Sequence, residues 1–265
     1  MIESLLSIDR LSAIAHRGGS KIRPENTLAA FDHAWALGVD AIECDVHLSR
    51  DGEVVVIHDA TLERTTDAKG PVASLSAVEL ARVDAGFHFA PAEGFPFRGR
   101  GIGVPTLHEI LGRYRDRVVI VEIKGEQVHV AERAVAVMRE HDATERVIVG
   151  GFCHAVMDAV RRAAPELATS ASRLEARRAL TRSHVWLTPR RPAFRLFQVP
   201  FRLRGQQMFR RSFVRTARRA GLPVQAWIVD EPADMRRLIE WGVTGIISDR
   251  PDVAVDLIKS LGPTA

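Results

Sequence analysis

Two histidines end short apolar runs in the first sixty residues. His16 is followed by Arg17 and two glycines, and His58 ends the run that begins at residue 55 and is followed by Asp59. Imidazole titrates near neutral pH, so two histidines can share proton transfer, one taking a proton from an attacking hydroxyl and one giving a proton to a leaving oxygen. A lone histidine at a strand end is more often structural, so this pair needs support from other groups.

Acidic residues interrupt two further apolar runs. Glu43 and Asp45 are two residues apart and therefore share one face of a strand, and Glu122 shares a face with Lys124 in the same way. Carboxylates that converge inside a barrel repel one another unless a cation neutralises them. Oxygen ligands suit Mg²⁺ or Ca²⁺ better than a soft metal. For a single pair, carboxylates bound to arginines remain the alternative.

Basic side chains accompany the histidines and carboxylates. Together with a divalent cation, Arg17 and Lys124 can neutralise the non-bridging oxygens of a phosphate as charge builds during transfer. Asp59 can orient an imidazole or begin the following loop. The sequence holds no P-loop and no Gly-x-Gly-x-x-Gly that opens a helix after a strand. The combination indicates phosphoryl transfer.

Elements that can position these residues alternate along the chain. Strands are predicted at residues 12–16, 39–47, 54–58, 118–123, 147–150, 167–170, 194–199, 224–229 and 245–248. Helices are predicted at 27–37, 127–140, 154–163, 174–181, 212–220, 232–241 and 251–260. Repeated βα units close into a barrel with the carboxyl ends of the strands at one face. We therefore expect an α/β fold, a (β/α)8 TIM barrel, as one domain over residues 1–265.

Residues 59–105 break this rhythm. They contain six glycines, four prolines and a short helix-like piece at 76–83. We expect an inserted excursion after the second strand region, lying over one mouth of the barrel. A lid or an element that shapes the substrate site would occupy that position.

Composition narrows the class of protein. The chain has 265 residues, 46% of them hydrophobic, and only two cysteines, Cys44 and Cys153, without metal-ligand spacing. A disulfide framework is therefore not expected. No secretory signal and no apolar stretch of membrane-spanning length is found, so we expect a soluble, cytoplasmic protein.

Arginines are concentrated between residues 173 and 219, where fourteen occur with one acidic residue, Glu175. A solvated basic face is the ordinary interpretation. Apolar residues interleave with the arginines: Trp186, Leu187, Phe194, Leu196, Phe197, Phe201, Leu203, Met208, Phe209 and Phe213. This mixture suits peripheral contact with an anionic membrane. No nucleic-acid motif accompanies it, so no nucleic acid is expected.

Taken in order, these motifs resemble the glycerophosphodiester phosphodiesterase family. The resemblance rests on residues 16–18, 24–27, 43–45, 58–59, 122–124, 198–200, 224–230 and 242–251. Each motif alone is weak, but the ordered set spans nearly the whole chain. One departure lies at Trp227-Ile228-Val229-Asp230, where the family commonly has threonine in the second position.

The resemblance implies a role for each matched residue. It makes His16 and His58 the catalytic pair, Glu43, Asp45 and Glu122 the ligands of one divalent cation, Mg²⁺ or Ca²⁺, and Arg17 and Lys124 phosphate contacts. It places Trp227 in the substrate pocket and gives Glu25 a supporting role, alongside Asp59. Asp249 is left open between a contact with the site and a helix cap, and His47 is expected to be a polar surface residue.

The implied reaction is hydrolysis of a glycerophosphodiester to glycerol 3-phosphate and an alcohol. It begins with attack of the glycerol hydroxyl on phosphorus, and water then opens the cyclic phosphate. A close alternative is release of the head group from a lysophospholipid, as in a lysophospholipase D. A metal-free phosphoinositide phospholipase C also uses two histidines in a barrel, but it has little need of three carboxylates. A barrel that binds a phosphorylated ligand without catalysis is the alternative from another class.

Overall fold

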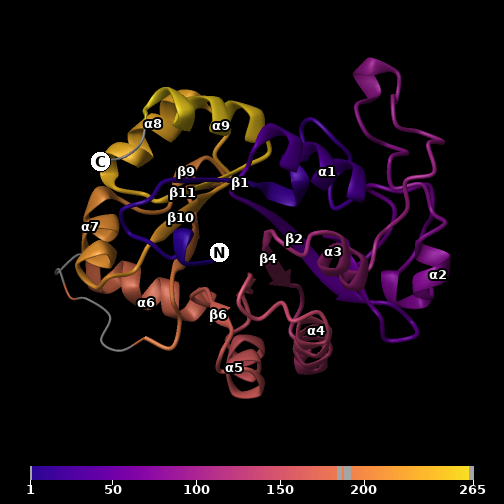
Figure 1. Cartoon of the computed structure of the whole chain (residues 1–265), viewed down its shortest axis with the longest axis horizontal. Helices are drawn as coiled ribbons and strands as arrows, with labels where there is room; N and C mark the ends of the chain where they lie inside the picture. Colours follow the sequence, from indigo (N-terminus) through magenta and orange to yellow (C-terminus); the bar gives the residue numbers. More distant parts are fainter. Residues whose placement is uncertain (1, 184–186, 188–191, 263–265) are drawn as a thin grey trace.

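Eight parallel strands form a barrel in the computed structural model of the chain, which describes residues 2–183, 187 and 192–262 (Figure 1). The strands are β1 (Ser12–Ala15), β2 (Ala41–Leu48), β4 (Val118–Ile123), β5 (Val147–Gly150), β6 (Ala168–Thr169), β7 (Phe197–Pro200), β10 (Val224–Trp227) and β11 (Gly245–Ser248). Their order is β6-β5-β4-β2-β1-β11-β10-β7, and a single parallel bridge between Ser170 and Leu196 joins the two ends. The predicted TIM-barrel fold is confirmed.

Helices cover the outside of the barrel (Figure 1). They are α1 (Leu28–Leu37), α3 (Leu107–Arg113), α4 (Val128–Glu140), α5 (His154–Ala163), α6 (Arg173–Ser183), α7 (Arg211–Arg219), α8 (Pro232–Trp241) and α9 (Pro251–Ser260). The sequence prediction missed α3, although Thr106 and Glu109 form a capping box at its start. Among the helices that the structure describes, none combines the length and the apolar character of a membrane span.

Because side chains alternate along each strand, the protein has two buried layers, one inside the barrel and one between the barrel and the helices. The even-numbered residues Val118 and Ile120 of β4 face the barrel interior, and they pack there with Ile14, Ile148 and residues of other strands. Odd-numbered residues of β4 pack outwards against the helices. Because side chains alternate with a period of two, Glu122 continues the inward row at the carboxyl end of the strand. The same alternation turns Glu43 and Asp45 inwards from β2.

β3 (Val54–Val56) differs from the predicted parallel arrangement. It pairs antiparallel with β2, with Val46 opposite Val56, so it is the return arm of a hairpin and is not one of the eight barrel strands. The amide of Ile57 donates to the carbonyl of Asp45 over 2.9 Å. The return arm therefore delivers His58 back to the level of the carboxylates on β2.

The inserted segment 59–105 projects from one side of the barrel (Figure 1, magenta). It contains α2 (Ala77–Leu80) and the short 3-10 turns η3 (Val72–Ser74) and η4 (Pro91–Glu93). A small apolar cluster that includes Leu62, Val72 and Leu80 joins it to β3. Pairing of Val55 with Thr106 closes the base of the excursion. The other short 3-10 segments are η1 (Ile2–Ser4) and η2 (His16–Gly18).

The arginine-rich stretch divides into core and surface. Six of the apolar residues between its arginines are buried: Phe194, Leu196, Phe197, Phe201, Phe209 and Phe213. Leu203 and Met208 remain exposed, around a hairpin of β8 (Arg202–Leu203) and β9 (Gln206–Gln207). Trp186, Arg190 and Arg191 lie outside the described residues. Most of the aromatic pattern thus reflects packing between the barrel and α7.

Candidate active site

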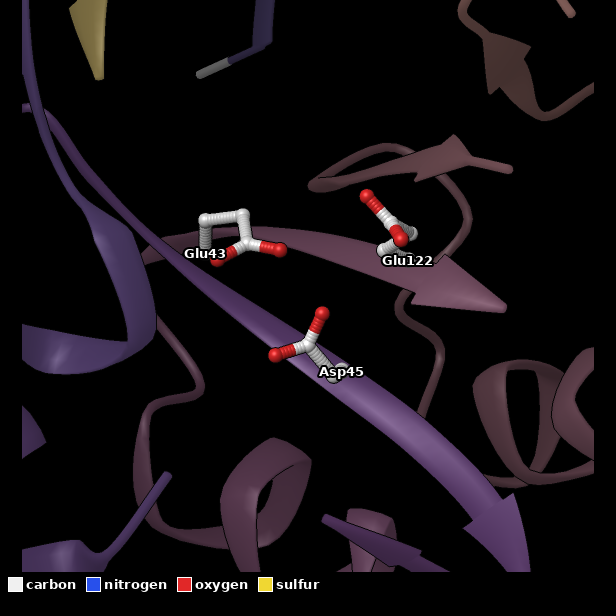
Figure 2. A group of neighbouring side chains, drawn as sticks. All are labelled: Glu43, Asp45 and Glu122. Atoms are coloured by element: carbon white, nitrogen blue, oxygen red, sulfur yellow. The ribbon is translucent and has the colours of Figure 1, made fainter. Parts of the chain in front are cut away.

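Three carboxylates meet at the carboxyl end of neighbouring strands. Glu43 and Asp45 extend from β2 and Glu122 extends from β4, with Asp45 and Glu122 directly paired in the sheet register (Figure 2). One oxygen from each side chain lies within 4.8 Å of the others. Glu43 and Asp45 are buried, and Glu122 is partly buried. The spacing predicted from the sequence therefore does bring these three groups together.

Asp45 is the most constrained of the three. The side-chain amide of Asn26 donates to its Oδ2 over 2.9 Å, and the Asp45 amide donates back to Oδ1 of Asn26 over 3.2 Å. Burial disfavours the carboxylate, but the charges of Lys124 and Arg17 outweigh burial and lower the pKa of Asp45 to about 2. Asp45 is thus held ionised, with one face fixed by an amide.

A cation already faces this acidic group. Nζ of Lys124 lies 2.8 Å from Oδ1 of Asp45 and also pairs with Glu122. Oδ1 of Asp45 is buried, and the ammonium of Lys124 compensates its charge. A largely buried, all-oxygen donor set of three carboxylates fits a hard divalent cation. Glu43, Asp45 and Glu122 are therefore the residues that could hold one.

Without a divalent cation, the burial and mutual repulsion of the three carboxylates disfavour their ionised forms. Burial, followed by the charge of Asp45, raises the pKa of Glu43 to about 8. Burial is also the main cause that raises the pKa of Glu122, and Lys124 opposes it. Glu43 thus favours protonation near neutral pH, and the pKa of Glu122 is shifted in the same direction. A bound cation would reverse that preference.

His16 leaves β1 at its carboxyl end and enters η2. Its Nδ1 lies 2.6 Å from Oδ1 of Asp249, which follows β11, and its Nε2 lies 3.9 Å from Oε2 of Glu43. Burial lowers the pKa of His16, but the hydrogen bond to Asp249 and the charge of Glu43 outweigh burial and raise it overall. With Nδ1 occupied, Nε2 is the nitrogen left to face the carboxylate side of the site.

Arg17 bends back over the three carboxylates. Its backbone is left-handed, with φ of 51°, and its amide donates to Oε2 of Glu43 over 3.1 Å. Its guanidinium donates to Glu25 over 2.9 Å and lies 3.0 Å from Oδ2 of Asp45. Gly18 must follow, because a Cβ there would lie 2.6 Å from the Cβ of Ala30. The His-Arg-Gly motif is thus a turn packed tightly against α1.

His58 is held by a second acidic residue. Its Nδ1 lies 2.5 Å from Oδ1 of Asp59, and Arg64 donates to the other oxygen of Asp59 and to both oxygens of Glu25. Burial is the main cause that lowers the pKa of His58, and nearby Arg17 adds to the effect. The pKa of Asp59 falls to about 2, because the Arg64 and His58 contacts outweigh its burial. Arg64 thereby joins the first turn of the insertion to the loop of Glu25.

One cavity of about 220 Å³ gathers both histidines. Its walls include His16, Arg17, Glu43, His58, Glu122, Lys124, Phe152, Gln198 and Trp227. Trp227 packs edge-on against Phe152, with ring centroids 5.8 Å apart. The residues singled out from the sequence thus converge, with Glu25 and Asp59 supporting Arg17 and His58 from behind.

Four residues near the site were missed, left open or expected at the surface from the sequence. Asp249 contacts His16, whereas α9 has Arg250 as its N-cap and no side-chain cap. Asn26 and Arg64 were given no role in the site, although Asn26 belongs to a motif that was recognised. His47 is half-buried, and its Nε2 hydrogen-bonds the carbonyl of His58 over 3.0 Å. The only signal for these contacts in the sequence is that polar residues recur next to the main motifs.

The barrel gathers histidines, carboxylates and basic side chains at the carboxyl ends of its strands. These are the groups that a phosphodiesterase needs for proton transfer and for compensation of phosphoryl charge. The model of the glycerophosphoryl diester phosphodiesterase family matches residues 16–253. The chain therefore belongs to this family, and it is a phosphoric diester hydrolase.

Individual relatives agree with the family match. A glycerophosphodiester phosphodiesterase of Caldanaerobacter subterraneus subsp. tengcongensis is 36% identical over 254 residues, covering 94% of this chain and 98% of the relative. The crystal structure of the enzyme from Agrobacterium tumefaciens superposes with a TM-score of 0.72 at 27% identity, covering 93% of this chain and 99% of that one. An Oleispira antarctica phosphodiesterase in complex with its product sn-glycerol-3-phosphate gives a TM-score of 0.75 at 25% identity, covering 93% and 96%.

Proposed function

We propose that the chain hydrolyses glycerophosphodiesters to glycerol 3-phosphate and an alcohol at the cavity between His16 and His58. One observation carries the proposal: the two histidines line the same cavity as Glu43 and Glu122, which form a cluster of carboxylates with Asp45. The glycerol 3-phosphate product bound to the Oleispira relative supports this class of substrate. Hydrolysis of a diester needs proton transfer at two oxygens and compensation of phosphoryl charge, and these residue types supply both.

The two imidazoles divide the proton transfers. One accepts the proton of the attacking glycerol hydroxyl as its oxygen bonds to phosphorus. The other protonates the departing alcohol oxygen as its bond to phosphorus breaks, which leaves a cyclic phosphate. Water then opens the ring with the two roles reversed. Asp249 and Asp59 each fix one Nδ1 and so direct the opposite nitrogen of the ring towards substrate.

The remaining residues bind charge and orient the substrate. When bound by Glu43, Asp45 and Glu122, a divalent cation would polarise the phosphoryl oxygens. Arg17 and Lys124 contribute fixed positive charge beside those oxygens, and both already line the cavity. Trp227 offers an apolar wall for the glycerol carbons. Glu25 holds the guanidinium of Arg17 in place through a hydrogen bond.

A panel of phosphodiesters tests the class of substrate and the metal together. Turnover of glycerophosphocholine is measured with Mg²⁺, with Ca²⁺ and after exhaustive chelation, for the wild type and for His16→Ala, His58→Ala and Asp45→Asn. We expect each variant to lose on the order of 10²-fold or more of kcat. Activity that survives chelation would favour metal-free phospholipase C chemistry. Hydrolysis unchanged in His16→Ala across all tested diesters would mean that the catalytic assignment of His16 is wrong, and absence of hydrolysis for every diester would leave a phosphate-binding barrel as the remaining function.

A second candidate function is release of the head group from a lysophospholipid. It is favoured by an apolar cavity of about 450 Å³ that adjoins the first and shares Glu122, Phe152, Gln198 and Trp227 with it. Contact with an anionic membrane through the arginines of 173–219 fits the same substrate, because several of these arginines are exposed. Comparing turnover of lysophosphatidylcholine with that of glycerophosphocholine decides between the two.

A further inference from the structure

Two glutamines lie side by side inside the barrel. Gln198 of β7 and Gln225 of β10 are opposite each other in the sheet register. The residues on either side of each belong to the buried layer between the barrel and the helices, so both glutamine side chains point inwards. Gln225 is fully buried, whereas Gln198 is half-buried and lines the catalytic cavity. The reaction proposed above uses neither side chain.

A chain of hydrogen bonds fixes the direction of both amides. The backbone carbonyl of Leu5 can only accept a hydrogen bond, and Nε2 of Gln225 donates to it over 3.3 Å. Oε1 of Gln225 therefore faces the other way, where Nε2 of Gln198 donates to it over 2.9 Å. Because its nitrogen is directed at Gln225, Gln198 has its oxygen at the far end of this chain. The carbonyl of Leu5 thus sets, through two amides, which atom of Gln198 is left for another partner.

Two glycines leave room for these side chains. A Cβ at Gly245 of β11 would lie 2.6 Å from Cγ of Gln225, and a Cβ at Gly150 of β5 would lie 3.1 Å from Oε1 of Gln198. Any other residue at Gly245 would therefore displace Gln225 from its position. A side chain at Gly150 would crowd the oxygen of Gln198. The interior of the barrel thus accommodates both amides.

The oxygen of Gln198 lies at the level of the carboxylates. Asp45, Glu122 and Gly150 are directly paired across β2, β4 and β5, so they form one layer at the carboxyl ends of these strands. Oε1 of Gln198 lies beside Gly150, where this layer has no side chain of its own. Among the described residues, Gln198 has a hydrogen bond at its nitrogen and none at this oxygen. A fixed acceptor therefore stands at the catalytic cavity.

The chemistry of the substrate determines which partner this acceptor can take. Ionised phosphate oxygens only accept hydrogen bonds, so Oε1 of Gln198 would repel them, whereas Arg17 and Lys124 of the same cavity attract them. The glycerol half of a glycerophosphodiester carries two hydroxyl donors. In the proposed reaction, the hydroxyl next to the ester gives its proton to an imidazole as it attacks phosphorus. The terminal hydroxyl is the donor that remains.

We propose that Oε1 of Gln198 accepts a hydrogen bond from the terminal hydroxyl of the glycerol moiety, and that Gln198 thereby selects glycerophosphodiesters in which this hydroxyl is free. The inference rests on the proposed function, since the phosphate must lie beside the two histidines. Gln225 acts through Gln198 as a positioning residue. A substrate without the terminal hydroxyl would leave the acceptor unpaired in a half-buried site, which disfavours its binding.

Two substrates that differ by one hydroxyl test the contact. kcat/KM is measured for glycerophosphocholine and for the phosphocholine ester of propane-1,2-diol, which keeps the attacking hydroxyl and lacks the terminal one. We expect the wild type to prefer glycerophosphocholine by about tenfold or more. Equal kcat/KM for the two diesters would overturn the inference.

Gln198→Met and Gln225→Met locate the preference, because methionine matches glutamine in length and offers only a weakly accepting sulfur. The preference should fall to about twofold or less in Gln198→Met. It should fall by a smaller factor in Gln225→Met, because Gln198 then keeps its oxygen but loses the partner that directs it. A purely structural effect would lower kcat/KM equally for both diesters, and the unaltered ratio would contradict the contact.

Gln127→Met is the matched control. Gln127 is exposed before α4, makes no side-chain cap, and lines neither of the two cavities. The wild-type preference for glycerophosphocholine should persist in this variant. A preference that also disappears here would show that the effect does not come from Gln198.

Binding measurements separate the inference from the proposed function. Calorimetric titration with sn-glycerol 3-phosphate and with propane-1,2-diol phosphate of the same configuration measures the preference without turnover. A tenfold difference in affinity without hydrolysis of either diester would overturn the proposed function and leave the contact with the hydroxyl standing. Equal affinities in a protein that hydrolyses both diesters equally would overturn the contact alone. Weaker binding of Mg²⁺ in Gln198→Met, with an unaltered ratio, would assign the oxygen to the cation and overturn the inference.

Discussion

Nδ1 of His16 lies 2.6 Å from Oδ1 of Asp249, although the two residues are 233 positions apart in the chain. The contact joins β1 to the end of β11, which pair side by side in the sheet, with Ala15 opposite Ser248. It fixes which nitrogen of the ring faces the site, and it stabilises the imidazolium when His16 is protonated. Asp249 therefore acts through His16 as a positioning residue.

Asp249→Asn should lower kcat by on the order of 10²-fold, because an amide neither fixes the tautomer nor stabilises positive charge on the ring. Since Asp249 raises the pKa of His16, the limb of the pH profile that reports His16 should move to lower pH. Steady-state kinetics with glycerophosphocholine between about pH 5 and 9 measures both effects. Asp252→Asn, at a surface ion pair with Arg250, is the control, and wild-type kcat in Asp249→Asn would refute the assignment.

Asn26→Ala should weaken binding of a divalent cation. Asn26 makes two hydrogen bonds with Asp45 and adopts a left-handed backbone, with φ of 57°. Loss of a partner that orients a metal ligand typically reduces metal affinity 10- to 100-fold. Calorimetric titration with Mg²⁺ or Ca²⁺ measures the change, and Lys69→Ala in the exposed insertion serves as the control. Unaltered affinity would mean that Asp45 is positioned without Asn26.

Binding of a cation should release protons at neutral pH. Without a cation the pKa of Glu43 is raised to about 8, so this carboxyl is largely protonated at pH 7, and a bound dication drives it to ionise. Calorimetric titration at pH 7 in two buffers with different heats of ionisation should reveal release of up to about one proton. Glu43→Gln cannot titrate and should abolish the difference between buffers. Heats independent of the buffer in the wild type would contradict this linkage.

Glu175 should stabilise the fold at neutral pH and lose that effect in acid. Arg161 donates to both of its oxygens over 2.9 and 3.1 Å, and the amide and hydroxyl of Ser172 donate over 2.8 Å each. Burial opposes ionisation, but these contacts outweigh burial and lower the pKa of Glu175. A lowered folded pKa stabilises above the unfolded value of about 4.3, and the stabilisation disappears as pH falls through the folded value.

The matching experiment compares Glu175→Gln with the wild type by thermal unfolding. We expect a loss of about 1–2 kcal/mol at pH 7, from the cap and the ion pair together. The difference should shrink below about pH 4. Glu132→Gln, exposed on α4, is the control. A deficit of the same size at both pH values would show that the charge of Glu175 contributes little.

The local part of the site could be predicted because it depends on short-range rules. Strand period two fixed the common face of Glu43 and Asp45, and the strand-end rule for βα barrels placed His16 at the catalytic face. The partners of these residues depend on contacts between distant segments. Asp249 reaches His16 only because the last strand pairs with the first, and Arg64 reaches Glu25 only because the insertion folds back.

The errors in the fold have similar causes. β3 resembles a barrel strand in composition, and only its short loop from β2 indicates a hairpin. α3 has seven residues, too few for a clear helical period. Phe197 and Phe213 suggested a lipid-facing surface because their neighbours are arginines, but they pack against each other in the core, with centroids 5.1 Å apart. Sequence proximity to charge did not indicate exposure.

The two ends of segment 59–105 meet at the pairing of Val55 with Thr106, where the amide of Val56 also donates to the carbonyl of Pro105 over 2.8 Å. An excursion whose ends already touch can lengthen or shorten at small entropic cost, because loop closure depends only weakly on length. The barrel would keep its register through such changes. Descendants of this chain can therefore replace the projecting part of this segment while inheriting the residues on the barrel strands unaltered.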